Sequence, residues 1–327
     1  MIDAGALVTS SLRISTPYVA AGLGGTVGER SGIINIGLEG MMLVGAFGFV
    51  LGAHHAAAWL GAESNLLPWL GLLTGLLSAG LLAGLHALVT CRFGADQLLS
   101  GLAINLLALG LTNVALKAQF GSSSNSSQVA RFSSLFPDSH PVVATLAHPL
   151  VLLVGLAVVV TGVGLGRTRW GLRTRACGEN LEAADAAGVP VMAVRVRAVI
   201  LGGCLAGLGG VCLASEQGFF SANMSNGRGF LALAAMILGR WRPSLVLMAC
   251  LLLGGAEAFQ MQLQLLREEL RPDAETLTVG WASLMGAVPL QAVQAFPYLL
   301  TIAVLAVLGQ RGGAPGALGR PFLPQGR

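Results

Sequence analysis

Few residues in this chain have the types and spacing of a catalytic site. The only lysine, Lys117, lies in Ala-Leu-Lys-Ala, whereas a phosphate-binding loop needs Gly-Lys followed by Ser or Thr. The histidines lack the spacing of a zinc site, and the GxSxG and HExxH motifs of hydrolases are absent. We therefore expect no catalytic residue, no metal and no cofactor in this chain. If ATP drives its activity, a separate ATPase chain must use it.

Polar residues are concentrated in a few segments of an otherwise apolar sequence. The first segment, Gly28–Gly40, is rich in glycine and contains the adjacent pair Glu29 and Arg30. Irregular backbone at membrane depth is tolerated only where it is buried in protein or lines an aqueous cavity. From the residues alone two interpretations stay open: a broken helix beside a translocation path, or a cytoplasmic turn with a solvated Glu29–Arg30 pair.

The second polar segment, Arg173–Val191, has the start and stop signals of a short helix. Asn180 is a good N-cap, and the acidic Glu182 and Asp185 suit the first turn. Gly188, followed by a proline, ends the helix. We predict a short, alanine-rich helix that docks into a groove of a partner protein, with an ordinary solvated connector as the alternative.

The third polar segment, Ser221–Phe230, combines the amides of Asn223 and Asn226 with a lone arginine, Arg228. These side chains are suited to the entry of a polar solute. A hairpin turn between two apolar segments is the alternative interpretation.

The elements that hold these segments are transmembrane helices. Hydrophobic residues make up 54% of the 327 residues and charged residues 10%, against about 25% charged in a typical soluble domain. Runs such as Leu66–Thr90 and Val142–Gly166 carry no formal charge, and a spanning helix needs about 20 apolar residues. They lack the alternation of barrel strands. We predict an all-α, polytopic bundle of about eight to ten spans with broken or re-entrant elements. The predicted span centres lie near residues 20, 45, 78, 107, 157, 207, 234, 253 and 298.

The basic residues predict an orientation. They gather at Arg92, in the segment 167–197, at Arg240 and Arg242, and in the tail. The positive-inside rule assigns these sites to the cytoplasm, which places residues 117–148 and 261–275 outside. The net charge of +4 therefore indicates topology and not nucleic-acid binding. The N-terminus lies outside if residues 14–28 cross fully, and inside if they form a re-entrant segment.

Several ordered segments share the pattern of one family. They are Thr16–Met42, Gly178–Gly188, Asn223–Pro243 and Ala317–Pro321. Together they resemble the permease subunit of bacterial nucleoside ABC importers, in the superfamily of the ribose and branched-chain amino acid permeases. The serine-rich stretch Gly121–Ser139 has no place in the family pattern.

The resemblance implies a single transmembrane permease domain over residues 1–308 and a flexible cytoplasmic tail over 309–327. The chain would be a multi-pass subunit of the bacterial cytoplasmic (inner) membrane. Its expected partners are a second homologous permease subunit, a cytoplasmic ATPase that uses ATP and Mg²⁺, an extracytoplasmic substrate-binding lipoprotein, the nucleoside and the lipid bilayer. The cytoplasmic loop 167–197 would couple to the ATPase. The implied coupling residues are Glu179, Asn180, Glu182, Ala183, Ala184, Asp185 and Gly188.

For the substrate pathway we predict polar residues that can hydrogen-bond ribose hydroxyls or base edges, with stacking from Phe47 or Phe230. The polar residues are Asn35, Glu39, Asn105, Asn223 and Asn226. A permease for sugars or branched-chain amino acids, a single-chain secondary transporter and a membrane scaffold are the alternatives. The pentapeptide Ala21–Gly25 recurs as Ala206–Gly210, which indicates either an inverted repeat or coincidence.

Overall fold

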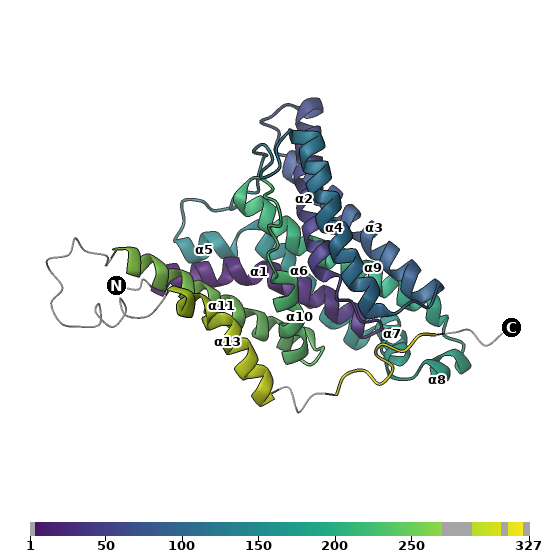
Figure 1. Cartoon of the computed structure of the whole chain (residues 1–327). Helices are drawn as coiled ribbons and strands as arrows, with labels where there is room; N and C mark the ends of the chain where they lie inside the picture. Colours follow the sequence, from purple (N-terminus) through teal and green to yellow (C-terminus); the bar gives the residue numbers. More distant parts are fainter. Residues whose placement is uncertain (1–3, 270–289, 309–312, 323–327) are drawn as a thin grey trace.

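The computed structural model describes residues 4–269, 290–308 and 313–322, and every regular element within these ranges is a helix (Figure 1). The helices are α1 (Ala4–Glu29), α2 (Leu38–Leu60), α3 (Leu67–Ala87) with a π-helical extension (Leu88–Arg92), α4 (Gln97–Phe120), α5 (Pro141–Leu146), α6 (Pro149–Arg167), α7 (Arg169–Glu179), α8 (Leu181–Ala186), α9 (Val191–Gln217), α10 (Arg228–Leu238), α11 (Pro243–Glu269) and α13 (Leu290–Leu308).

Within the described residues, six helices have the length and apolar composition needed to cross a membrane. They are α2, α3 with its extension, α4, α6, α9 and the Pro243–Leu265 part of α11. The predicted all-helical class is confirmed for the described part of the chain, whereas the count of eight to ten spans stays a prediction. Large apolar side chains such as Leu81, Leu106 and Val159 are exposed on α3, α4 and α6, as expected for faces in contact with lipid.

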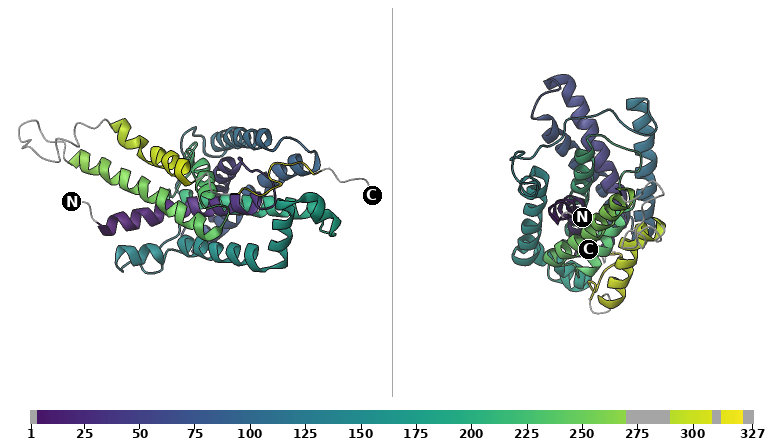
Figure 2. Two further views of the ribbon diagram at one scale, coloured as in Figure 1. Left: turned by 90° about the horizontal axis from the view of Figure 1, so that it is seen from below. Right: turned by 90° about the vertical axis from the view of Figure 1, so that its left-hand side faces the viewer.

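The helices form two groups that meet at α1 and α10. In Figure 1, α2, α3, α4 and α9 lie together on one side, α11 and α13 lie on the other, and α1 and α10 run between them. Figure 2 shows the same bundle along two further directions, with α11 and α13 side by side. The hydrophobic core extends from one group of helices into the other, because most of the second half of α1 and of α9 is buried.

Helices α1 and α9 are antiparallel neighbours. Gly24 lies against Gly202, and Pro17 lies against Gly209. Farther along, Arg13 of α1 forms an ion pair with Glu216 of α9 at 2.5 Å. The start of α1 is therefore on the same side as the end of α9. If the predicted cytoplasmic side is correct, this arrangement favours the option in which the start of α1 lies outside.

Glycines let α9 pack closely against three other helices, and against α1 and α2 at backbone distance. A Cβ on Gly202 would lie 2.5 Å from the carbonyl oxygen of Gly24, and a Cβ on Gly45 of α2 would lie 2.5 Å from Cα of Gly207. A Cβ on Gly75 of α3 would lie 2.6 Å from the side chain of Val211. Small residues at such contacts are a common way for helices to pack in membranes. The repeated pentapeptide contributes glycines to this packing on both α1 and α9.

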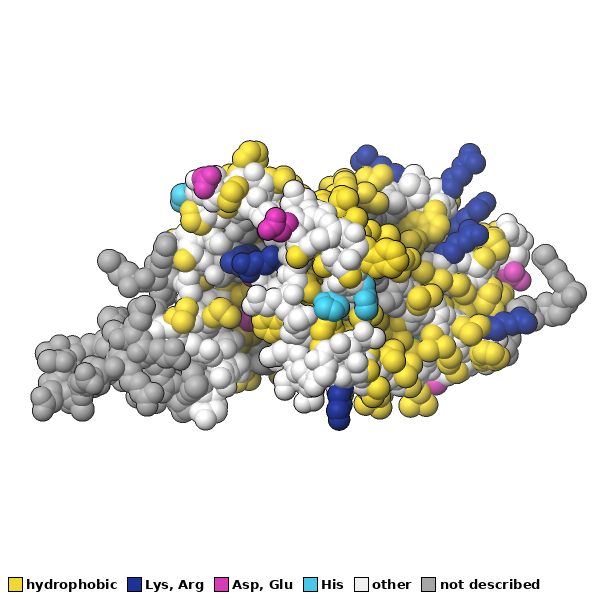
Figure 3. All heavy atoms as spheres, turned by 90° about the horizontal axis from the view of Figure 1, so that it is seen from above, with side chains coloured by type: hydrophobic (Ala, Val, Ile, Leu, Met, Phe, Trp, Pro, Cys, Tyr) yellow, Lys and Arg dark blue, Asp and Glu magenta, His cyan; other side chains and the backbone are white. Residues whose placement is uncertain are grey.

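The basic side chains gather toward one end of the bundle. Figure 3 shows a face on which hydrophobic side chains cover much of the surface and most of the visible Lys and Arg side chains lie toward one end. That end holds α7 and α8 in Figure 1. The grouping agrees with the predicted cytoplasmic side.

Candidate coupling surface and membrane junction

The predicted short helix in the arginine-rich segment is present as α8. The Asn180 side chain accepts a hydrogen bond from the Ala183 backbone N–H at 3.0 Å, so the predicted N-cap is confirmed. The helix ends at Ala186, and Gly188 has a φ of 77°, a left-handed conformation that glycine adopts without strain. The chain then enters α9.

Only one face of α8 is available to a partner protein. Glu182, Ala183 and Gly188 are exposed, and Asp185 is half-buried. Ala184 is only 4% exposed and packs toward α7, α9 and the tail. Ala184 was expected to face the partner, but it belongs to the inner face of α8. We refer below to the exposed residues between Glu179 and Gly188 as the coupling surface.

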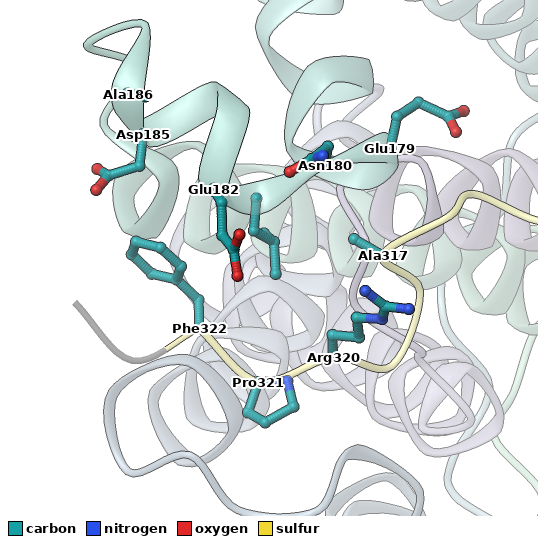
Figure 4. Close-up of a pocket in the computed structure, with 10 residues that line it drawn as sticks. Glu179, Asn180, Glu182, Asp185, Ala186, Ala317, Arg320, Pro321 and Phe322 are labelled. Carbon is teal, nitrogen blue, oxygen red and sulfur yellow. The ribbon is translucent and has the colours of Figure 1, made fainter. Parts of the chain in front are cut away.

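Part of the tail lies against this surface. A cavity of about 460 Å³ separates α8 from residues 317–322, and Figure 4 shows Glu182 extending from α8 toward the tail segment. The Ala317 N–H donates to the Gly178 carbonyl at 2.7 Å, and the Gly316 N–H donates to the Glu179 carboxylate at 3.3 Å. The expected flexible tail is therefore held to the end of α7 over part of its length.

Arg195 of α9 holds the tail and the Gly28–Gly40 segment together. Its side chain is buried at 2% exposure, and it donates to the carbonyls of Ser31 at 3.0 Å and Arg320 at 2.9 Å. Longer contacts of 3.4 Å reach the carbonyls of Gly32 and Ala317. The sequence groups Arg195 with the other cytoplasmic arginines, but its partners are backbone oxygens from two distant segments. It connects the neighbourhood of α8 to the end of α1.

The Glu29–Arg30 pair is not a solvated pair. Glu29 is 6% exposed and accepts a hydrogen bond from the Trp241 indole N–H at 2.7 Å. Arg30 donates through Nε to the Trp241 carbonyl at 3.0 Å. Both side chains therefore bind the loop before α11. Of the two interpretations of Gly28–Gly40, the solvated turn is excluded and a buried break between α1 and α2 is observed.

Asn35 and Asn105 support this break. The Asn105 side chain accepts from the Gly40 N–H at 2.8 Å and donates to the Ile36 carbonyl at 3.1 Å. It thereby satisfies backbone groups that the break leaves open at the start of α2. Asn35 is fully buried, and its side-chain N–H lies 3.5 Å from the sulfur of Met41.

Glu39 joins the start of α2 to the start of α10. The Glu39 residue is 8% exposed. Its carboxylate accepts hydrogen bonds from the Gly227 N–H at 2.8 Å and the Gly229 N–H at 2.6 Å. A carboxylate at a helix N-terminus satisfies free N–H groups and the positive end of the helix dipole. We call this meeting of α2 and α10 the membrane junction.

The remaining predicted pathway residues, Asn223 and Asn226, lie in the turn before α10. Both are exposed, with φ values of 57° and 42°, conformations that asparagine tolerates better than most residues. The segment before them pairs with the serine-rich outer stretch, because the Ala222 N–H donates to the Ser124 carbonyl and the Val129 N–H to the Gly218 carbonyl, each at 2.8 Å.

The expected stacking residues differ in accessibility. Phe47 is 7% exposed and packs edge-on against Phe220 at 5.2 Å between ring centroids. It is not open to a solute in this conformation. Phe230 is 45% exposed.

A polar cavity that the sequence did not predict lies beside the junction. The cavity measures about 390 Å³, and Tyr18, Arg228 and Glu257 are among the residues that line it. A periodic signal was present: Glu257, Gln260 and Gln264 fall at i, i+3 and i+7 on one apolar helix. Tyr18 gave no local signal of a role, because its partners are distant in sequence.

The architecture is that of a multi-pass helical membrane protein. The chain is broken between α1 and α2, and the starts of α2 and α10 meet inside the bundle. The family model for the permease component of branched-chain amino acid transport systems matches residues 7–305. The chain belongs to this family. It is therefore a component of a transport system and not itself an enzyme.

Relatives within the family match nearly the whole chain. The nucleoside ABC transporter permease protein NupC of Lactococcus lactis is 33% identical, over 97% of this chain and 96% of the relative. The guanosine ABC transporter permease protein NupQ of Bacillus subtilis is 34% identical over the same shares. A putative glucose ABC transporter permease protein of Haloferax volcanii is 35% identical, over 94% of this chain and 92% of the relative. No solved structure matches the chain.

Proposed function

We propose that this chain is the pore-forming subunit of an ATP-driven importer that moves nucleosides inward. The observation that carries the proposal is the near full-length similarity to permease proteins named for nucleoside and guanosine transport. The polar residues at the membrane junction and in the adjoining cavity support it, because an uncharged, hydroxyl-rich solute needs hydrogen-bonding groups along its path.

The proposal includes the partners that such an importer requires. A cytoplasmic ATPase would use ATP and Mg²⁺ and bind the coupling surface, where Glu182 and Ala183 are exposed. A second homologous permease subunit would complete the pore, and a substrate-binding lipoprotein would deliver the nucleoside from outside. The assembly would lie in the bacterial cytoplasmic membrane.

Movement of the ATPase would reach the membrane through a short chain of contacts. Glu179 and Gly178, next to α8, bind the tail, and Arg195 binds both the tail and Ser31 after α1. Rigid elements joined in this way transmit displacement between sites. Alternating access would then follow from ATP binding in the partner.

A sugar importer is the second candidate function. The relative named as a putative glucose permease has a similar identity over a similar share of the chain. A single-chain secondary transporter has no comparable support, since the family consists of permease components of multi-part systems.

The test is uptake by the reconstituted complex of this chain with its ATPase, second permease subunit and binding protein. We expect ATP-dependent uptake of labelled uridine or guanosine, and no uptake of glucose or leucine. ATP-dependent uptake of glucose alone would establish the second candidate in place of the first.

The same assay tests the coupling surface through Glu182→Arg. Reversing an exposed charge at the proposed contact should lower uptake at least about tenfold, which corresponds to about 1.4 kcal/mol of lost coupling, and should weaken ATPase capture by this chain. Glu63→Arg, on the exposed turn between α2 and α3, is the matched control. Full uptake by the Glu182→Arg complex would reject the assignment of α8 as the ATPase contact.

A further inference from the structure

The polar cavity beside the membrane junction is built from distant parts of the chain. Tyr18 comes from α1, Arg228 from the start of α10, Glu257 and Gln264 from α11, and Gln294 from α13. Its volume of about 390 Å³ falls within the range of about 300–1,000 Å³ that is typical of small-molecule sites.

Charged groups inside the cavity are paired with each other. The Arg228 guanidinium lies 3.2 Å from the Glu257 carboxylate and also donates to the Met224 carbonyl at 3.2 Å. The Tyr18 hydroxyl donates to the other oxygen of Glu257. The pair contributes no net charge to the cavity, so the cavity offers hydrogen bonds without a strong preference for a charged solute.

The cavity lies beside the middle of α1, a helix that packs against the candidate spans α9 and α11. Tyr18 stands 11 residues before Glu29, the last residue of α1. At a rise of 1.5 Å per residue, this places Tyr18 about 16 Å from the cytoplasmic end of the helix. The hydrocarbon core is about 30 Å thick, so the cavity lies near its middle.

The polar face of α11 is incompatible with lipid. Glu257, Gln260 and Gln264 share one side of the helix, and all three line the cavity. Ionisable and strongly polar groups at this depth are costly and are retained where they face a bundle interior or a water-filled path. The face therefore borders either a solute path or another protein chain.

We propose that this cavity is a binding subsite, inside the membrane, for the hydroxyl-bearing sugar part of a nucleoside; the proposal rests on the nucleoside transport proposed above. Glutamine amides and the tyrosine hydroxyl supply both donors and acceptors, which vicinal hydroxyls require. The free N–H groups at the start of α10 are already bound by Glu39. What this region contributes to the cavity is therefore the side chain of Arg228, together with Asn226 in the turn before α10.

The first experiment measures the concentration dependence of uridine uptake by the reconstituted complex. The double variant Gln260→Leu/Gln264→Leu should raise the half-saturating concentration at least about tenfold. The control is Gln262→Leu, on the same stretch of α11 but outside the cavity, which should stay within about twofold of wild type. Equal half-saturation for the double variant and the wild type would overturn the proposal.

The second experiment measures access to the cavity directly. Gln264→Cys in the complex should react with a water-soluble thiol reagent, and uridine should slow that reaction several-fold while leucine does not. The wild-type protein gives the background, since its cysteines are buried or half-buried. No reaction at this position would show that another subunit covers the face, and equal reaction with and without uridine would show an aqueous space that does not bind it. Either result rejects the subsite.

The two proposals fail in different ways. If the wild-type complex carries uridine but the cavity variants behave like wild type, nucleoside transport stands and the subsite is wrong. If the wild-type complex carries no nucleoside, the proposed function is wrong and the assignment of the cavity to a nucleoside falls with it.

Discussion

Replacement of Glu39 by glutamine should destabilise the protein by removing part of the cap on α10. The carboxylate accepts from two backbone N–H groups, those of Gly227 and Gly229. A glutamine has one acceptor oxygen, so one of these bonds is lost and an NH₂ group then faces an N–H donor. A hydrogen bond to a charged group contributes about 1.5–3 kcal/mol. The lost charge at the helix N-terminus adds about 0.3–2 kcal/mol.

These contributions predict a loss of about 2–5 kcal/mol in folding free energy. The entropy of unfolding is about 2.1 cal/mol/K per residue, so for the 327 residues of this chain about 1 kcal/mol lowers Tm by about 1.5 °C. In a thermal unfolding experiment on the purified protein in detergent, we expect Glu39→Gln to lower Tm by at least about 3 °C. Glu216→Gln is the control, because Glu216 is exposed and its ion pair with Arg13 contributes at most about 1 kcal/mol.

The outcome separates a structural role for Glu39 from the solute contact that the sequence suggested. A lower Tm with uptake reduced in proportion to the folded protein supports the cap. An unchanged Tm with abolished uptake would refute the capping argument and assign the carboxylate to the substrate pathway.

Two further substitutions test other contacts. Arg195→Lys replaces a fork that reaches several carbonyls by a single ammonium group, so the tail should detach. Chymotrypsin should then cut after Phe322, which packs against the end of α7 and α8, several-fold faster. Arg197→Lys, exposed on the same helix, should leave the cutting rate unchanged. Gly202→Val should abolish the peak of folded protein in fluorescence-detected size exclusion, because a Cβ there would lie 2.5 Å from a backbone oxygen of α1. Gly155→Val, with open space around its Cβ, should yield wild-type amounts of folded protein. Normal yields of Gly202→Val would contradict the close packing.

Local signals made α8 predictable. The cap at Asn180 acts over three residues, and Gly188 supplies a backbone conformation that needs no distant partner. The arginine distribution similarly predicts the cytoplasmic end without any knowledge of helix packing. These features depend on the residues nearest to them in the chain.

The membrane junction and the cavity were only partly predictable. Glu39 and Asn105 were correctly marked as unusual in an apolar context, but their partners are backbone groups elsewhere, and the Glu39 contact spans 188 residues. Tyr18 and Glu257 are 239 residues apart. No periodicity identifies such a pair, because it depends on how α1 and α11 pack and not on the composition of either helix.

The glycine contacts of α9 have a consequence for movement. Where Gly202 meets Gly24 and Gly207 meets Gly45, backbone touches backbone. Glycine has no side chain whose rotamer could change if one helix shifted along the other. Sliding one helix past another would bring residues with side chains into spaces that hold only hydrogen atoms. Helices α1, α2, α3 and α9 are therefore expected to move as one rigid body. Shape changes during a transport cycle would then be confined to the joints around it, among them the side where α11 and α13 border the polar cavity.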